Sequence, residues 1–158
     1  MFKFYLIIFA ILLSKFSVLA IAEETDDMYK TIVKAVDIND FTLMASQYHI
    51  DAVIVSPTKT ELAKNSIKRW KIDGEKLYAN GGKAVVEMRF KERVINKESA
   101  YETGIYYYKT IDSDNNVIEY YSHFADLSVK KNNKWVVIME KNVKQATAVE
   151  FNQLHKWQ

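Results

Sequence analysis

The stretch that decides the fold is residues 101–129, which read YETGIYYYKTIDSDNNVIEYYSHFADLSV. Two runs rich in tyrosine, valine and isoleucine flank the turn-forming residues 112–116, DSDNN. Because aromatic and β-branched residues favour strands, this pattern predicts two sequential antiparallel strands joined by a turn. Strands of about 10–13 residues would be roughly twice the usual length, and strands this long twist and coil strongly.

The alternating pattern continues on both sides of this stretch. Apolar and polar residues alternate over residues 84–91, and a tight turn at 131–134 precedes a last apolar strand at 135–143. Upstream, a short strand is expected at 52–55. Apolar residues at helical spacing predict three N-terminal helices and one short C-terminal helix, over residues 28–36, 41–48, 58–74 and 147–157.

The third helix has its own start and stop signals. Thr58 and Glu61 have the spacing of a capping box, which begins a helix, and Gly74 is expected near its end. The order of elements therefore predicts an α+β roll, in which a strongly curved antiparallel sheet packs against three N-terminal helices, with a pocket on the concave side. The chain of 158 residues, 49% hydrophobic, is sufficient for one such domain, over residues 23–158.

Residues 1–22, MFKFYLIIFAILLSKFSVLAIA, have the features of a secretory signal peptide. Lys3 is followed by the apolar run 4–13, which is too short for the ~20 residues that span a bilayer. Small residues precede a predicted cleavage after Ala22, so we expect a secreted or periplasmic protein with no membrane span after signal removal. Removal also leaves equal numbers of acidic and basic residues, which disfavours nucleic acid as a partner.

The mature sequence resembles the nuclear-transport-factor-2-like superfamily, in its SnoaL-like or ketosteroid-isomerase-like branch. The resemblance is carried by four segments in order: 51–57 (DAVIVSP), 67–70 (IKRW), 100–106 (AYETGIY) and 130–137 (KKNNKWVV). It implies a cone-shaped roll with a pocket, and frequently a homodimer through the sheet, but no single activity. Glu140 stands where relatives often carry Asp.

Acid/base chemistry on this fold needs a carboxylate or histidine in an apolar pocket. The candidates are Asp51, Glu102, His123 and Glu140. Each has a structural alternative, such as a backbone hydrogen bond for Asp51, a cross-strand ion pair or solvent exposure for Glu102, and a hydrogen-bonded core position for His123. The chain contains no Cys and no phosphate- or nucleotide-binding motif, and we expect neither a cofactor nor a metal.

Alternation sends Tyr106 and Tyr108 to one face of their strand and Tyr107 to the other. We expect the pocket to be lined by Tyr48, Trp70, Met88, Phe90, Tyr106, Tyr108 and Tyr121. The predicted function is binding of a small apolar or amphipathic molecule by an exported domain that forms a homodimer. The alternatives are a cofactor-independent isomerase, dehydratase or cyclase that uses a pocket carboxylate or His with Tyr support, and a protein-interaction module that uses the outer face of the sheet.

Overall fold

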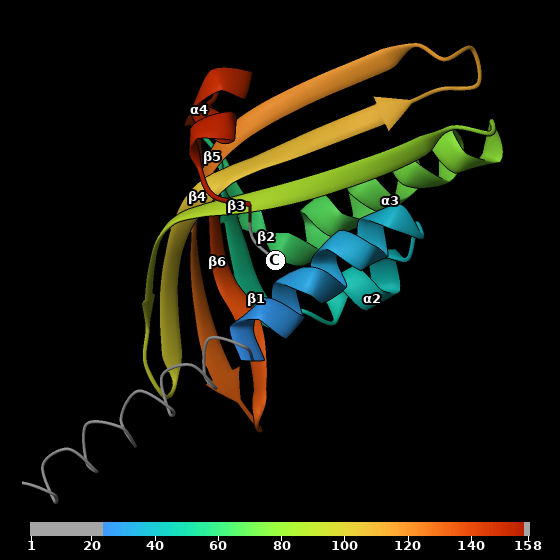
Figure 1. Cartoon of the computed structure of the whole chain (residues 1–158). Helices are drawn as coiled ribbons and strands as arrows, with labels where there is room; N and C mark the ends of the chain where they lie inside the picture. The colour runs from blue at the N-terminus through green and yellow to red at the C-terminus, as the bar shows by residue number, and fades with distance from the viewer. Residues whose placement is uncertain (1–23, 157–158) are drawn as a thin grey trace, which may run out of the picture.

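A six-stranded, strongly bent sheet forms the body of the protein (Figure 1). The computed structural model describes residues 24–156, so the predicted signal peptide and the end of the predicted C-terminal helix lie outside the described residues. The chain is helical over residues 24–37. The remaining elements are α2 Phe41–Ala45, β1 Tyr48–Val55, β2 Thr60–Leu62, α3 Ala63–Ala79, β3 Lys83–Ile95, β4 Ser99–Ile111, β5 Val117–Lys131, β6 Lys134–Gln145 and α4 Ala148–Gln153.

The strand order is β2-β1-β6-β5-β4-β3, and β3 to β6 form an antiparallel meander. This arrangement confirms the predicted α+β roll, with one correction to the expectation of a wholly antiparallel sheet. β1 lies parallel to β6, because the chain leaves β1, crosses through α3 and the meander, and returns beside it. Such a pairing requires a long crossover connection, which these elements supply.

The long strands are strongly bent (Figure 1), and Gly104 lies within β4. This residue pairs with Phe90, next to a register shift between Phe90 and Glu92 of β3. A Cβ atom at Gly104 would lie only 2.1 Å from the backbone oxygen of Arg89. The absence of a side chain therefore lets β3 and β4 approach closely at this residue.

The third helix differs from its prediction at both ends. The expected capping box does not form, since Leu62 is the N-cap and makes no side-chain cap bond. Glu61 instead accepts hydrogen bonds from Ser66 Oγ at 2.6 Å and from Arg69. The helix also continues past Gly74 to Ala79. A Cβ at Gly74 would lie 2.6 Å from the ring of Phe41, so this glycine allows close packing on α2 rather than ending the helix.

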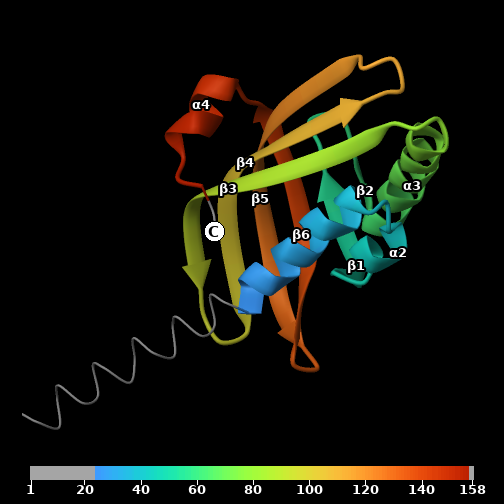
Figure 2. The same ribbon diagram turned by 45° about the vertical axis from the view of Figure 1, so that its right-hand side comes forward.

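The second helix is shorter than expected and ends at Ala45, so that Tyr48 is the first residue of β1. The N-terminal helix, α2 and α3 cover the concave side of the sheet, where two clusters of buried apolar side chains lie. α4 packs on the opposite, convex side (Figures 1 and 2), where Phe151 contacts Tyr107 and Tyr121. In residues 24–156 no helix is both long and apolar enough to cross a membrane.

Candidate functional site

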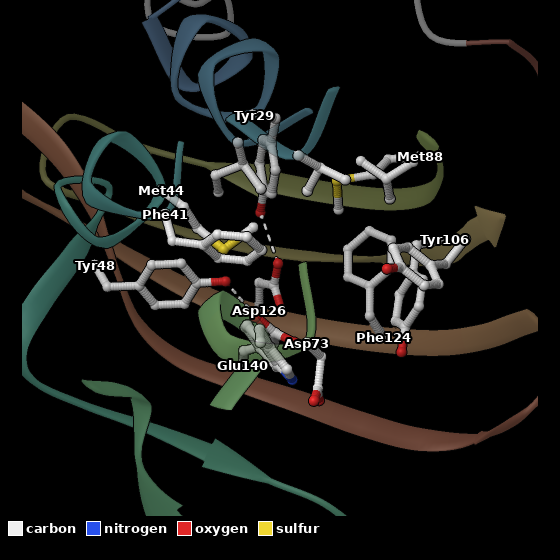
Figure 3. Close-up of a pocket in the computed structure, with 15 residues that line it drawn as sticks. Tyr29, Phe41, Met44, Tyr48, Asp73, Met88, Tyr106, Phe124, Asp126 and Glu140 are labelled. Atoms are coloured by element: carbon white, nitrogen blue, oxygen red, sulfur yellow. Dashed lines mark hydrogen bonds between the residues drawn. The ribbon is translucent and has the colours of Figure 1, made fainter. Parts of the chain in front are cut away.

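A cavity of about 410 Å³ lies between the three helices and the concave face of the sheet (Figure 3). Aliphatic and aromatic side chains form most of its wall. Three carboxyl groups also line it, those of Asp73, Asp126 and Glu140, whereas no Arg, Lys or His is among the lining residues. The aromatic lining residues are Tyr29, Phe41, Tyr48, Trp70, Tyr106, Tyr108 and Phe124.

A row of four charged residues crosses the concave face of the sheet. Arg93 of β3 pairs in register with Glu102 of β4, Glu102 with Asp126 of β5, and Asp126 with Glu140 of β6. Directly paired residues on neighbouring strands project from the same face. The row therefore places one guanidinium and three carboxyl groups side by side, and only Asp126 and Glu140 of the four line the cavity.

Two tyrosines donate hydrogen bonds to the cavity half of this row. The Tyr48 hydroxyl donates to Glu140 Oε2 at 2.5 Å, and the Tyr29 hydroxyl donates to Asp126 Oδ2 at 3.3 Å (Figure 3). The Asn142 side chain donates to Glu140 Oε1 at 3.4 Å. Asp126 is only 4% exposed, and within the described chain its Oδ1 atom has no hydrogen-bond partner. The carboxyl pair thus retains a buried, unpartnered acceptor oxygen in the wall of the cavity.

The surroundings of Asp126 and Glu140 favour the protonated, neutral form of both carboxyl groups. Burial raises the pKa of Asp126, and the neighbouring Glu140 charge raises it further, while the Tyr29 hydrogen bond opposes both effects. Burial likewise raises the pKa of Glu140, against the hydrogen bonds from Tyr48 and Asn142. Carboxyl groups in such surroundings stay protonated to higher pH than exposed ones, and can then donate as well as accept hydrogen bonds.

The other half of the row forms an ion-pair network closed off from the cavity. Glu102 is fully buried, and Arg93 Nε donates to its Oε1 atom at 2.7 Å. Arg93 also pairs with Asp26 at 2.6 Å and donates to Thr25 Oγ1 at 3.1 Å, both on the N-terminal helix. Burial raises the pKa of Glu102 and the Arg93 charge lowers it. Glu102 therefore forms a cross-strand ion pair, which was the structural alternative to a catalytic role in the sequence analysis.

Three of the four candidate acid/base residues lie outside the cavity: Glu102, in its ion pair with Arg93, and also His123 and Asp51. His123 is on the convex side, where its Nε2 is 3.3 Å from Glu150 of α4. The Asp51 side chain is 81% exposed and lies 3.8 Å from His49. Of the four candidates, Glu140 lines the cavity and Glu102 lies in the same row of charged residues. His123 and Asp51 are separate from both.

Most of the residues expected to line a pocket do line this cavity: Tyr48, Trp70, Met88, Tyr106 and Tyr108. The other two expectations need correction. Phe90 is on the concave side but packs between the rings of Tyr29, at 5.0 Å, and Phe124, at 5.8 Å, outside the cavity lining. Tyr121 pairs with Tyr107 and therefore faces the convex side, where the two rings stack at 4.8 Å.

Sequence reasoning missed Tyr29, Asp73 and Asp126. A signal for Asp126 was present, because Asp is rare in strands and this one follows the inward-facing Phe124 by two residues. Tyr29 and Asp73 are on helices, and only the packing of those helices brings them to the cavity. Among residues 24–156, no group of three or more His, Asp or Glu side chains is placed to hold a metal ion.

Comparison with known proteins finds similarity in structure and not in sequence. No protein-family model matches the chain, and no curated protein matches it. A conserved protein from Planctomyces limnophilus DSM 3776 is similar with a TM-score of 0.66 and 16% identity, over 80% of this chain and 98% of that one.

Two further solved structures carry a family name. An NTF2-like protein with a cystatin-like fold from Novosphingobium aromaticivorans has a TM-score of 0.66 and 12% identity, over 91% of this chain and 95% of that one. An NTF2-like superfamily protein from Salmonella enterica serovar Typhimurium has a TM-score of 0.60 and 12% identity, over 83% of this chain and 95% of that one. Identities this low show the fold alone. The chain has the nuclear-transport-factor-2-like fold.

Proposed function

We propose that this domain binds a small, largely apolar molecule in the cavity on the concave side of the sheet. The observation that carries the proposal is the cavity of about 410 Å³, with an aromatic and aliphatic wall and the carboxyl pair of Asp126 and Glu140. Ligand sites typically measure about 300–1,000 Å³ and combine an apolar lining with a few polar groups that orient the ligand. The cavity has both features.

The ligand reaches the cavity beside α3. Asp73 lines the cavity and is also exposed to solvent, so the cavity opens at this helix. Trp70 precedes Asp73 by three residues and shares its face of the helix. An apolar body would contact Trp70 on entry and then pack against the rings of Tyr106 and Tyr108. The polar end of the molecule would meet Asp126 and Glu140 or remain at the opening.

The test uses the neutral probe 1-naphthalenemethanol and two matched variants. Val86 lines the cavity, whereas its neighbour Val85 faces the other side of β3 and is 37% exposed. Val86→Phe fills the cavity and should weaken binding, measured by calorimetry, by about 10-fold or more. Val85→Phe should change it by less than about twofold. Equal binding by both variants, or no binding by the unmodified protein, contradicts the proposal.

A second candidate function is acid/base catalysis, and it is favoured by a specific observation. Asp126 is buried and Glu140 is half-buried, and both are carboxyl groups with raised pKa values that are hydrogen-bonded to a tyrosine. One carboxylate could remove a proton from the carbon beside a carbonyl, while a hydroxyl or a protonated carboxyl donates a hydrogen bond to the resulting enolate oxygen.

That reaction class has a direct assay. The neutral ketone 2-tetralone is incubated with the protein in D₂O, and deuterium entry at the carbon beside its carbonyl is followed by NMR. The protein should accelerate exchange, and Glu140→Gln should remove the acceleration. The exposed Asp51 gives the control, because Asp51→Asn should exchange like the unmodified protein. The same exchange rate with and without protein contradicts catalysis.

We further propose that the domain functions outside the cytoplasm, in the periplasm or beyond the cell. Support comes from residues 1–22, whose apolar run and small residues before Glu23 follow the pattern of a cleaved secretory signal. Mass spectrometry of the exported protein should find Glu23 as its first residue. A protein that retains Met1 contradicts this proposal.

The expected homodimer through the sheet also remains a proposal. α4 covers part of the convex face, where Phe151 packs on Tyr107 and Tyr121. A second copy, or another protein partner, would therefore use the parts of the convex face that α4 leaves exposed. Light scattering at several protein concentrations tests the dimer, and a monomer at all of them contradicts it.

A further inference from the structure

We propose that the ligand carries a positively charged amine, which Asp126 and Glu140 hold among the aromatic rings of the cavity. This inference rests on the proposed function and adds the chemical class of the ligand. Three independent features of the cavity support it: the sign of its charges, an unused acceptor atom, and the kind of side chain that forms its wall.

The charges that line the cavity are all of one sign. Asp73, Asp126 and Glu140 line it, and no basic side chain is among the lining residues. The cation in the same row, Arg93, is already paired with Glu102 at 2.7 Å and with Asp26 at 2.6 Å. A buried carboxylate without a cation is costly, and a partner charge offsets that cost. A cationic ligand supplies the charge that the cavity wall lacks.

The unused acceptor is Oδ1 of Asp126. This side chain is 4% exposed and lines the cavity, and its other oxygen accepts from Tyr29. In the part of the chain that the structure describes, Oδ1 has no partner. Both oxygens of Glu140 already accept, from Tyr48 and Asn142. A hydrogen-bond donor that reached this buried oxygen would complete the pair, and an ammonium group donates without accepting.

The aromatic wall suits the same ligand class. Figure 3 shows Asp126 and Glu140 between Phe41 and Tyr48 on one side and Phe124 on the other. Aromatic faces attract an organic cation, by about 0.5–2 kcal/mol per ring according to its desolvation, and they also pack against apolar groups. Rings and carboxylates together are the usual surroundings of a bound amine.

The proposal predicts how binding depends on pH. The titratable groups that face the pair are Tyr29 from the N-terminal helix, Tyr48 from β1, Glu102 and Tyr106 from β4, and Asp73 from α3. Burial raises the pKa values of the three tyrosines, which therefore stay protonated. Because burial also raises the pKa values of the pair, an ammonium group must displace protons from it. Amine affinity should rise with pH and binding should release protons.

A neutral ligand that binds through a carbonyl would behave in the opposite way. Its oxygen can only accept a hydrogen bond, so where it binds at Asp126 or Glu140 it needs the protonated form of that carboxyl group. Its affinity would fall as the pH rises and the pair loses its protons. The sign of the pH dependence therefore distinguishes an amine from a carbonyl ligand.

The experiment compares three probes of the same shape and different charge: 1-naphthylmethylammonium, 1-naphthalenemethanol and 1-naphthoate. Calorimetry between pH 5 and pH 8, in buffers of different ionisation enthalpy, measures affinity and proton release. The ammonium probe should bind about 10-fold or more tightly than the alcohol near pH 7, and the carboxylate probe most weakly. Asp126→Asn and Glu140→Gln should each reduce the ratio of ammonium to alcohol affinity by about 10-fold. The exposed control, Asp51→Asn, should leave the ratio unchanged.

The outcomes separate the inference from the proposed function. If the alcohol or the carboxylate binds as tightly as the ammonium probe, the inference is wrong and the ligand site stands. If both variants keep the ammonium preference of the unmodified protein, the assignment to Asp126 and Glu140 is wrong. If no probe binds, the proposed function itself is wrong. Two variants are used so that Glu140→Gln decides the question should Asp126→Asn fail to fold.

Discussion

The two halves of the charged row across the sheet bury the same chemical groups in different ways. At one end, Glu102 is fully buried and forms an ion pair with Arg93. Arg93 in turn forms a second ion pair with Asp26. At the other end, Asp126 and Glu140 face each other in register with only neutral hydrogen-bond donors. Both halves lie on the same face of neighbouring strands, yet only the second half lines the cavity.

This difference distinguishes two kinds of buried carboxylate, those with a cation partner in the protein and those without one. A buried charge that has its cation within the protein is internally satisfied, and removing the cation leaves a large penalty. A buried carboxyl pair without a cation is unsatisfied in the protein alone, and a ligand or a proton must complete it. We therefore assign Glu102 to the stability of the fold, and Asp126 and Glu140 to the proposed ligand site.

The largest expected effect comes from breaking the satisfied half. Arg93→Met leaves the fully buried Glu102 without its cation, which should lower the free energy of unfolding by about 3–5 kcal/mol. Urea denaturation measures the loss. The double variant Arg93→Met/Glu102→Gln removes the orphaned charge and should recover part of it. A loss below about 1 kcal/mol in the single variant would show that Arg93 does not neutralise Glu102.

The next effect concerns the unsatisfied half and depends on pH. The pKa values of Asp126 and Glu140 are raised in the folded protein. Their contribution to the free energy of unfolding is therefore fully present at a pH below the pKa values of the unfolded chain, near 4. This contribution is lost as the pH rises through the folded values, by at most about 1.4 kcal/mol per pH unit for each extra proton that the folded state holds.

The double variant Asp126→Asn/Glu140→Gln should remove this part of the pH dependence. It should unfold at a similar urea concentration to the unmodified protein near pH 4, and at a higher one near pH 8. Urea titrations at the two pH values provide the measurement. A variant that is less stable than the unmodified protein at both pH values would contradict the view that ionisation of the pair destabilises the folded protein.

A smaller effect is expected from the hydrogen bond that supports the pair. Tyr48→Phe removes the hydroxyl that donates to Glu140 at 2.5 Å, and a bond to a charged group contributes about 1.5–3 kcal/mol. The loss should be greater near pH 8 than near pH 4, because this donor lowers the pKa of Glu140 and stabilises its charged form. Tyr108 is the matched control, since it lines the same cavity without contacting the pair, and Tyr108→Phe should cost less than about 0.5 kcal/mol.

Much of the fold could be predicted because its signals are local. Alternation along residues 101–110 predicted that Tyr106 and Tyr108 share one face of their strand and that Tyr107 lies on the other, as the structure has them. The parallel pairing of β1 with β6 could not be found in this way, because it joins residues far apart in the sequence. The capping-box pattern at Thr58 failed because Glu61 binds Arg69 instead.

The site was less predictable because it depends on register between strands. Period two shows that Asp126 shares a face with Phe124, but not that Asp126 lies opposite Glu140. The pairing of β5 with β6 shifts between Leu127 and Ser128, and nothing in the local pattern marks such a shift. The same limit explains Tyr121, whose pairing with Tyr107 places it on the convex side.

The smallest expected effect comes from the convex side and tests whether the function is confined to the cavity. His123 lies near Glu150 of α4, with its side chain 22% exposed, and is separated from the carboxyl pair by the sheet. His123→Gln should therefore change the free energy of unfolding by less than about 0.5 kcal/mol. It should change the binding of 1-naphthylmethylammonium by less than about twofold, measured by calorimetry. A loss of affinity of about 10-fold would show that a residue on the convex face contributes to binding. The difference between the two halves of the charged row would then no longer account for the site.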